Sequence, residues 1–168
     1  MEKNEIERKF AVTESEKKAV QAYLSQNGFI YEGKNQIVDD YYLVIENSEY
    51  LRIRHTKSPT LDHHKVINED TCEEISVPIS DTKGMAIMLN KLGYEHQITV
   101  DKTRVAYTNS QVEVVLDYLE GLGNFVEIEV YEGTREDMNN LVDQLELTNE
   151  VKKRGYPDLL ISHTNKNK

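Results

Sequence analysis

The sequence has little of several features that would place a protein in a specialised class. It contains one cysteine, Cys72, so an internal disulfide framework and a cysteine-based zinc site are both excluded. No apolar run approaches the ~20 residues that a membrane-spanning helix needs. The first residues also lack the basic and then apolar layout of a secretory signal, because Glu2 and Glu5 interrupt it. These absences together predict a cytoplasmic protein with no membrane partner.

Positive charge is also scarce. The chain has 20 lysines and arginines against 30 aspartates and glutamates, which gives a formal net charge of −10. An acidic protein repels the backbone of nucleic acids, so we expect no nucleic-acid partner. A local basic pocket for a small polyanion is still compatible with this charge. Lysines and arginines inside an acidic shell favour a phosphate ligand that brings its own metal ion.

The length and composition predict one folded domain. The chain has 168 residues, of which 38% are hydrophobic and 30% are charged, enough for a soluble domain with a sizeable core. We assign residues 1–161 to this domain and residues 162–168 to a polar C-terminal tail. The sequence shows no internal repeat, low-complexity block or linker.

Alternating apolar and polar residues predict a protein rich in strands. We expect strands over residues 1–12, 29–44, 51–54, 61–67, 72–79, 94–108, 111–119 and 125–131. We expect three helices, which begin after the capping residues Thr13, Asp81 and Thr134. Short turns join most strands, so antiparallel pairing should dominate.

Several strands carry charged residues on one face and apolar residues on the other. Successive side chains of a strand point to opposite faces, so Glu5, Glu7 and Lys9 share a face that Ile6 does not. The charged faces carry matched acids and bases. The acids are Glu5, Glu7, Asp117, Glu127 and Glu129, and the bases are Lys9, Arg52, Arg54, Lys65, Lys102 and Arg104.

Such matched faces predict an inverted barrel. An ordinary sheet turns its charged face to water. A sheet closed on itself could instead turn charged faces inward, with the apolar faces outside under the helices, the reverse of a barrel filled with packed side chains. The predicted fold class is therefore α+β, an eight-stranded antiparallel closed β-barrel with a polar interior and helices packed on the outside.

Other polar and aromatic residues have simpler interpretations. His63 and His64 are adjacent and so face opposite sides of a strand, which favours surface positions for both. Tyr41 and Tyr42 either pack or lie near a bound base, and packing is favoured.

Several motifs, in order along nearly the whole chain, resemble those of one superfamily. They are Glu5-x-Glu7-x-Lys9, Leu51-Arg52-Ile53-Arg54, Lys65, Lys102-x-Arg104, Asp117, the stretch from Leu122 to Glu129, and the stretch from Gly155 to Leu160. The chain is identified by them as a member of the CYTH superfamily, which is named for class IV adenylyl cyclase and thiamine triphosphatase. Its members are also called triphosphate tunnel metalloenzymes.

The resemblance implies a fold, a cofactor and a set of site residues. The fold is an eight-stranded antiparallel tunnel with a hydrophilic interior, and the cofactor is Mg²⁺ or Mn²⁺. The implied metal ligands are Glu5, Glu7, Asp117, Glu127 and Glu129. The implied phosphate-binding residues are Lys9, Arg52, Arg54, Lys65, Lys102 and Arg104, and the implied catalytic residues are Glu5, Glu7, Lys9, Lys102, Arg104 and Glu127. Cys72 stands where many members carry an arginine.

These residue types suit phosphoryl chemistry. Mg²⁺ takes oxygen ligands in octahedral geometry, and the planar fork of arginine matches phosphate oxygens. The partner is then a small-molecule triphosphate: ATP, thiamine triphosphate or tripolyphosphate. We favour a class IV adenylyl cyclase-like enzyme that converts ATP to cyclic AMP and pyrophosphate. The alternatives are a triphosphate hydrolase (an inorganic tripolyphosphatase or thiamine triphosphatase), a non-catalytic nucleotide- or polyphosphate-binding module, and an acidic β-barrel interaction domain. The physiological substrate, the preferred metal and a homodimeric state stay open.

Overall fold

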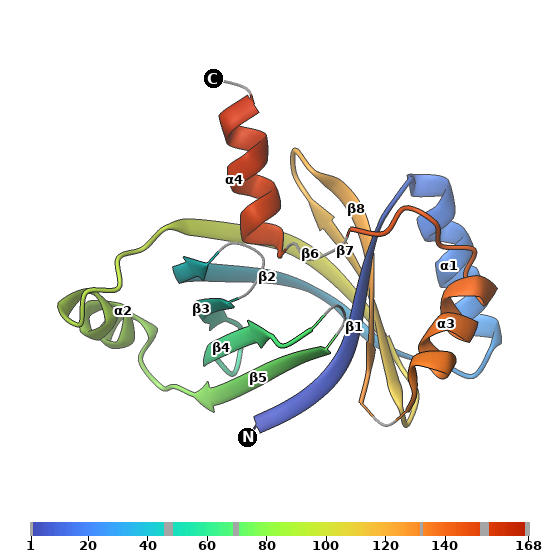
Figure 1. The fold of residues 1–168 in the computed structure, drawn as a ribbon, viewed down its shortest axis with the longest axis horizontal. Coiled ribbons are helices and arrows are strands. Elements are labelled where there is room, and N and C mark those ends of the chain that lie inside the picture. The colour runs from blue at the N-terminus through green and yellow to red at the C-terminus, as the bar shows by residue number, and fades with distance from the viewer. Residues whose placement is uncertain (1, 46–48, 69–70, 132, 152–154, 167–168) are drawn as a thin grey trace. The chain divides into compact units, whose positions relative to one another are not determined.

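The computed structural model describes residues 2–45, 49–68, 71–131, 133–151 and 155–166, with the side chains of residues 2–5, 43–45 and 165–166 left out. The strands are β1 (Glu2–Val12), β2 (Ile30–Ile45), β3 (Glu49–His55), β4 (Thr60–Val66), β5 (Thr71–Pro78), β6 (Ile98–Thr108), β7 (Val112–Leu119) and β8 (Gly123–Val130) (Figure 1). The helices are α1 (Glu14–Gln26), α2 (Thr82–Lys91), α3 (Arg135–Gln144) and α4 (Tyr156–Lys166). None of the helices in these described stretches is long and apolar enough to cross a membrane.

The eight strands form an antiparallel sheet that closes in a ring. Neighbouring strands follow the order β1-β5-β4-β3-β2-β6-β7-β8. The pairings β3–β4 and β7–β8, for example, are antiparallel over their full register. This arrangement confirms the fold class predicted from the sequence.

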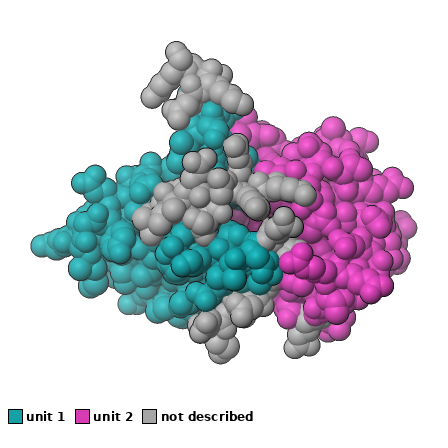
Figure 2. Space-filling view, viewed as in Figure 1, with its two compact units in different colours: residues 1–4, 37–101, 153–168 teal, residues 5–36, 102–152 magenta. Residues whose placement is uncertain are grey.

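The chain divides into two compact units. Unit 1 comprises residues 1–4, 37–101 and 153–168, and unit 2 comprises residues 5–36 and 102–152 (Figure 2). Strands β2 and β6 each contribute to both units. Each unit has its own hydrophobic cluster and its own charged sheet face.

The hydrophobic core of unit 2 lies between its strands and the helices α1 and α3. Val20 and Leu24 of α1 and Met138 of α3 pack with Val126 and Ile128 of β8, and all five side chains are at most 2% exposed. Helix α1 begins with the predicted capping box, in which Thr13 and Glu16 satisfy each other's backbone N–H groups. The apolar sheet face is thus covered by helices, as the inverted pattern requires.

Unit 1 has a smaller apolar cluster of the same design. Ile53 of β3 packs with Tyr42 of β2 and Leu89 of α2, and Leu51 and Leu61 lie against them. Asp81 caps α2 by accepting a hydrogen bond from the Gly84 backbone N–H at 2.9 Å, as predicted. Helix α2 therefore covers the apolar face of β3 and β4.

Two boundaries differ by more than two residues from those predicted. Strand β6 begins at Ile98 and not at Tyr94, and the backbone N–H of Gln97 donates to the Tyr41 carbonyl at 2.8 Å just before it. At the C-terminus, helix α4 continues to Lys166, whereas the polar composition predicted a tail from Ser162. Four helices are thus described where the sequence predicted three.

Candidate functional site

A charged cluster lies on the face of the unit 2 sheet that points away from α1 and α3. We call it the Asp117 cluster, and its members are Glu7 and Lys9 of β1, Lys102 and Arg104 of β6, Asp117 of β7, and Glu127 of β8. The strand register opposes Lys9 to Glu127 and Arg104 to Asp117. The apolar residues that alternate with them, such as Phe10 and Val126, are those that pack in the core.

Asp117 is the centre of this cluster. Its Oδ1 accepts from Arg104 Nε at 2.8 Å, and its Oδ2 accepts from Arg104 Nη2 at 2.6 Å and from Lys102 Nζ at 3.1 Å. Asp117 is fully buried, and Lys102 is 3% exposed. In such a bidentate pair, two parallel hydrogen bonds fix the orientation of the guanidinium plane relative to the carboxylate plane.

Glu127 extends the network toward β1. It accepts from Arg104 Nη2 at 2.7 Å, and its other oxygen lies 2.8 Å from Lys9 Nζ. Lys9 Nζ also donates to Glu7 Oε1 at 3.5 Å. Three basic side chains thus alternate with three acidic ones over the four strands β1, β6, β7 and β8.

Local charge keeps the buried carboxylates ionised. Burial alone would raise the pKa of Asp117, but the positive charges of Arg104 and Lys102 outweigh burial and lower it. Burial acts on the pKa of Glu127 in the same way, and Lys9, a hydrogen bond with Glu7 and the charge of Arg104 hold it well below its ordinary range. Both carboxylates are therefore ionised at neutral pH.

Unit 1 carries a second charged cluster, which we call the Arg52 cluster. Arg54 donates from Nε and Nη2 to the two oxygens of Asp39 at 2.9 and 3.0 Å. Arg52 donates from Nε to Asp62 at 2.9 Å and from Nη2 to Glu74 at 3.1 Å. Asp39 and Asp62 are at most 1% exposed, so two buried carboxylates hold the two guanidinium groups in place.

Aromatic rings line the same face of unit 1. The ring of Tyr50 stacks on His64, with centroids 4.4 Å apart and an angle of 5° between the planes. The Arg52 guanidinium lies 5.4 Å from the Tyr50 centroid, and Tyr41 meets Tyr50 edge-on at 5.2 Å. This face thus combines fixed cations with flat apolar surfaces.

One predicted site residue, Lys65, is placed elsewhere by the register, and a second, Glu129, is held by a tyrosine hydroxyl. Lys65 of β4 is opposite Glu49 and next to His64, so it lies on the other face of the sheet from Arg52, and its side chain is 49% exposed. Glu129 follows Glu127 on the same face, but it accepts a 2.7 Å hydrogen bond from the Tyr131 hydroxyl. The structure does not bring Lys65 to the other bases. The side chain of Glu5 lies outside the described residues.

Four members of the unit 1 face are not indicated by the sequence pattern. Asp39, Asp62 and Glu74 were not chosen as site residues, and His64 was predicted at the surface although it is 5% exposed. The two-residue spacing of Asp62 and His64 on β4 matches that of Arg52 and Tyr50 on β3, and this signal could have found two of the four. That signal is readable only once the pairing of β3 with β4 is known.

Comparison with known proteins identifies the family of this chain. The sequence model of the CYTH domain matches residues 3–156. A Methanocaldococcus jannaschii protein, named as a proposed adenylate cyclase, is 33% identical over 137 residues, which are 74% of this chain and 76% of that protein. An Aeromonas hydrophila adenylate cyclase is 36% identical over 61 residues, which are 36% of this chain and 31% of that protein.

Solved structures share the fold over most of the chain. A Pyrococcus horikoshii protein has a TM-score of 0.77 and 25% identity, with 94% of this chain and 98% of that chain covered. A Vibrio parahaemolyticus protein, also named as a proposed adenylate cyclase, has a TM-score of 0.79 and 22% identity with the same coverage. The fold and the sequence define a protein of the triphosphate tunnel class. The chain belongs to the CYTH domain family.

Proposed function

We propose that the protein is a divalent-metal-dependent enzyme that converts ATP to cyclic AMP and pyrophosphate. The observation that carries this proposal is the buried, alternating network of the Asp117 cluster. A sheet of purely structural role has no reason to bury Lys102, Asp117 and Glu127 together beside the partly buried Arg104, because each buried ion loses hydration. A site for a metal ion and a polyphosphate needs both signs of charge side by side.

The acids of this cluster suit a hard cation. Carboxylate oxygens are the ligands that Mg²⁺ and Mn²⁺ take in proteins, and Glu7 and Glu127 offer theirs on one sheet face. A bound divalent ion would neutralise phosphate charge and polarise the phosphoryl oxygens. Glu5 and Glu129 stay in the proposed ligand set. Asp117 gives both oxygens to Lys102 and Arg104, so we assign it the positioning of these cations.

The bases of both clusters suit phosphate oxygens. Lys9, Lys102 and Arg104 would exchange a carboxylate partner for a phosphate oxygen when substrate binds. Arg52 and Arg54 are held by buried aspartates and would contribute bidentate contacts to the same substrate class. Lys65 lies on the other sheet face and is therefore left out of the proposed phosphate contacts.

The choice of reaction depends on which phosphorus meets a nucleophile. In cyclisation the 3′ oxygen of ATP attacks the α-phosphorus and pyrophosphate leaves, and in hydrolysis a water attacks the terminal phosphorus. Such reactions ask the protein mainly for positioning and charge stabilisation. The names of the two curated relatives support cyclisation.

Product analysis tests the proposal. The protein is incubated with ATP, thiamine triphosphate and tripolyphosphate in turn, with Mg²⁺ or Mn²⁺, and the products are separated by chromatography. We expect cyclic AMP and pyrophosphate from ATP, and no product after chelation of the metal. Release of orthophosphate without cyclic AMP would replace the cyclase with a triphosphatase. No turnover of any of the three would contradict an enzyme of this class.

A further inference from the structure

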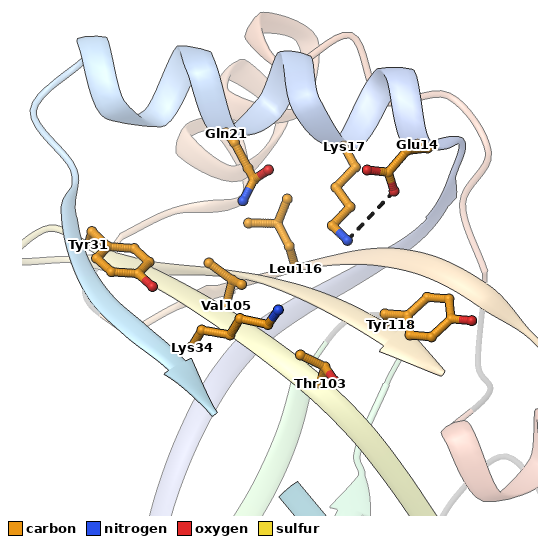
Figure 3. A pocket seen from close by; sticks show the side chains of 9 residues that line it. All are labelled: Glu14, Lys17, Gln21, Tyr31, Lys34, Thr103, Val105, Leu116 and Tyr118. Carbon is orange, nitrogen blue, oxygen red and sulfur yellow. Dashed lines mark ion pairs between the residues drawn. The ribbon is translucent and has the colours of Figure 1, made fainter. Parts of the chain in front are cut away.

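A pocket of about 390 Å³ lies on the outer side of the unit 2 sheet, beneath helix α1 (Figure 3). We propose that it is a second small-molecule site, which binds a phosphate monoester that carries a flat ring. The pocket is formed by α1, β2, β6 and β7, and its volume falls within the ~300–1,000 Å³ of small-molecule sites. It lies on the side of the sheet that carries the helices, whereas the Asp117 cluster lies on the other side.

Two lysines give the pocket its anion-binding character. Lys17 reaches down from α1 and Lys34 rises from β2, so that both ammonium groups point into the same space (Figure 3). Lys17 is oriented by Asn124 at 3.0 Å and by Glu14 at 3.8 Å. Within the described part of the chain, Lys34 makes no hydrogen bond or ion pair. The lining thus contains two cations and one exposed carboxylate, a local excess of positive charge in a chain whose net charge is −10.

The rest of the lining suits a ring. Val105 and Leu116 form an apolar floor, while Tyr31 and Tyr118 stand at the two sides of the pocket in Figure 3. These tyrosines are 56% and 46% exposed, although aromatic side chains of this size usually bury most of their area. The amide of Gln21 adds a hydrogen-bonding group. Ammonium groups beside aromatic faces and an aliphatic floor fit a phosphate attached to a flat heterocycle.

The pocket is joined to the charged cluster through two strands. Thr103 lines the pocket and lies between Lys102 and Arg104 on β6, and Leu116 and Tyr118 flank Asp117 on β7. Neighbouring residues of a strand face opposite sides. A ligand in the pocket therefore contacts the same strand segments that hold the cluster. We expect it to change turnover as well, a consequence that rests on the proposed function, whereas binding itself does not.

Methyl NMR of the full chain tests the site, with adenosine monophosphate as the probe and no divalent cation present. We expect saturable shifts of the Val105 and Leu116 methyl signals. Lys34→Ala and Tyr118→Ala should each weaken this binding by about tenfold or more, since each removes one contact of the phosphate or the ring. Both side chains are exposed, so the folded spectrum should otherwise be kept. Adenosine and inorganic phosphate, tested separately, should each bind more weakly than the monophosphate.

A variant of the other face distinguishes the two sites. Arg104→Ala should leave the Val105 and Leu116 response to adenosine monophosphate in place, because Arg104 points away from the pocket. No shift of these methyl signals in the wild type, or equal shifts in Lys34→Ala, would overturn the second site. Loss of the response in Arg104→Ala alone would also overturn it, because the probe would then bind at the Asp117 cluster. Absence of turnover would contradict the proposed function and leave this readout intact.

Discussion

Removing charged side chains from water costs free energy, and a few residues of the Asp117 cluster are buried in this way. Asp117, Lys102 and Glu127 are each at most 6% exposed, and each loses hydration that its ion pairs only partly restore. Replacing such a network by apolar residues of similar size is often neutral or stabilising in other proteins. This cost supports the proposal that the network serves to bind a ligand.

Glu127 is the carboxylate whose loss should affect turnover most clearly. Glu127→Gln keeps the shape of the side chain and removes the negative charge, whose two oxygens face Lys9 and Arg104 respectively. We expect metal-dependent turnover to fall by about 100-fold or more. The melting temperature should show that the variant is still folded under the assay conditions. Glu136→Gln, on the exposed first turn of α3, is the matched control. Wild-type rates in Glu127→Gln would remove Glu127 from the site.

Lys102 should act on substrate affinity. Lys102→Ala removes a buried ammonium group that we assign to phosphate, and a charge-assisted hydrogen bond contributes about 1.5–3 kcal/mol. The expected result is a KM raised by roughly 10- to 100-fold in steady-state kinetics. Lys91→Ala, at the exposed end of α2, should leave KM unchanged. An unaltered KM in Lys102→Ala would exclude a phosphate contact by this residue.

Asp62 should make part of the stability depend on pH. Burial raises its pKa, but the charge of Arg52 and hydrogen bonds from Ser76 and Arg52 outweigh burial and lower it. A lowered folded-state pKa contributes stability above the unfolded value of ~3.9 and loses it as pH falls toward the folded value. Urea unfolding between pH 6 and about pH 2 should therefore show a smaller pH dependence in Asp62→Asn than in the wild type. Identical slopes would show that Asp62 has no such role.

At the scale of elements, alternation along each strand separates the charged and apolar faces. In β8, Glu127 lies on the charged face, while Val126 and Ile128 pack against α1 and α3. Helix α1 supplies Leu24, which is completely buried in this cluster. The helices are thus the cover for an apolar exterior, and the sheet depends on them for its core.

This packing is tested by one helical side chain. Leu24→Ala should lower the free energy of unfolding by about 2–5 kcal/mol, because it removes buried methyl groups and leaves a cavity. Leu92→Ala is the matched control, since Leu92 is 68% exposed and its truncation should change stability by less than about 0.5 kcal/mol. Equal effects of the two variants, measured by urea unfolding, would contradict a core under α1.

The elements were largely predictable because their signals are local. The capping residues Thr13, Asp81 and Thr134 each begin a helix as predicted, and strand periodicity located all eight strands. The partners of the strands were not predictable in the same way. The faces of Lys65 and His64 follow from the register of β4 against β3, where a shift of one residue exchanges the two faces.

The C-terminus shows the other limit of local signals. The polar sequence after Ser162 predicted a tail, but α4 continues to Lys166. A polar composition indicates that a segment is exposed to solvent, but it does not exclude a helix with a narrow apolar face. Within α4, the Thr164 hydroxyl donates to the Leu160 carbonyl at 2.9 Å, a contact that composition does not reveal.

At the scale of the whole molecule, each unit repeats the same plan. Unit 2 holds Lys9, Lys102 and Arg104 with buried acids, and unit 1 holds Arg52 and Arg54 with buried acids. The chain as a whole is strongly acidic, with a net charge of −10, whereas arginines and lysines gather on these two faces. Each face, taken by itself, offers basic side chains that suit phosphate oxygens, in keeping with the proposed function.

The most direct test is calorimetric titration of tripolyphosphate in the presence of Mn²⁺. Wild-type protein should bind in a saturable manner, and chelation of the metal should weaken the binding. Arg104→Ala in unit 2 and Arg52→Ala in unit 1 should each weaken it by about tenfold or more, whereas Lys91→Ala should not. Unchanged affinity in both arginine variants, with folding verified by circular dichroism, would contradict the assignment of these charged faces to a triphosphate.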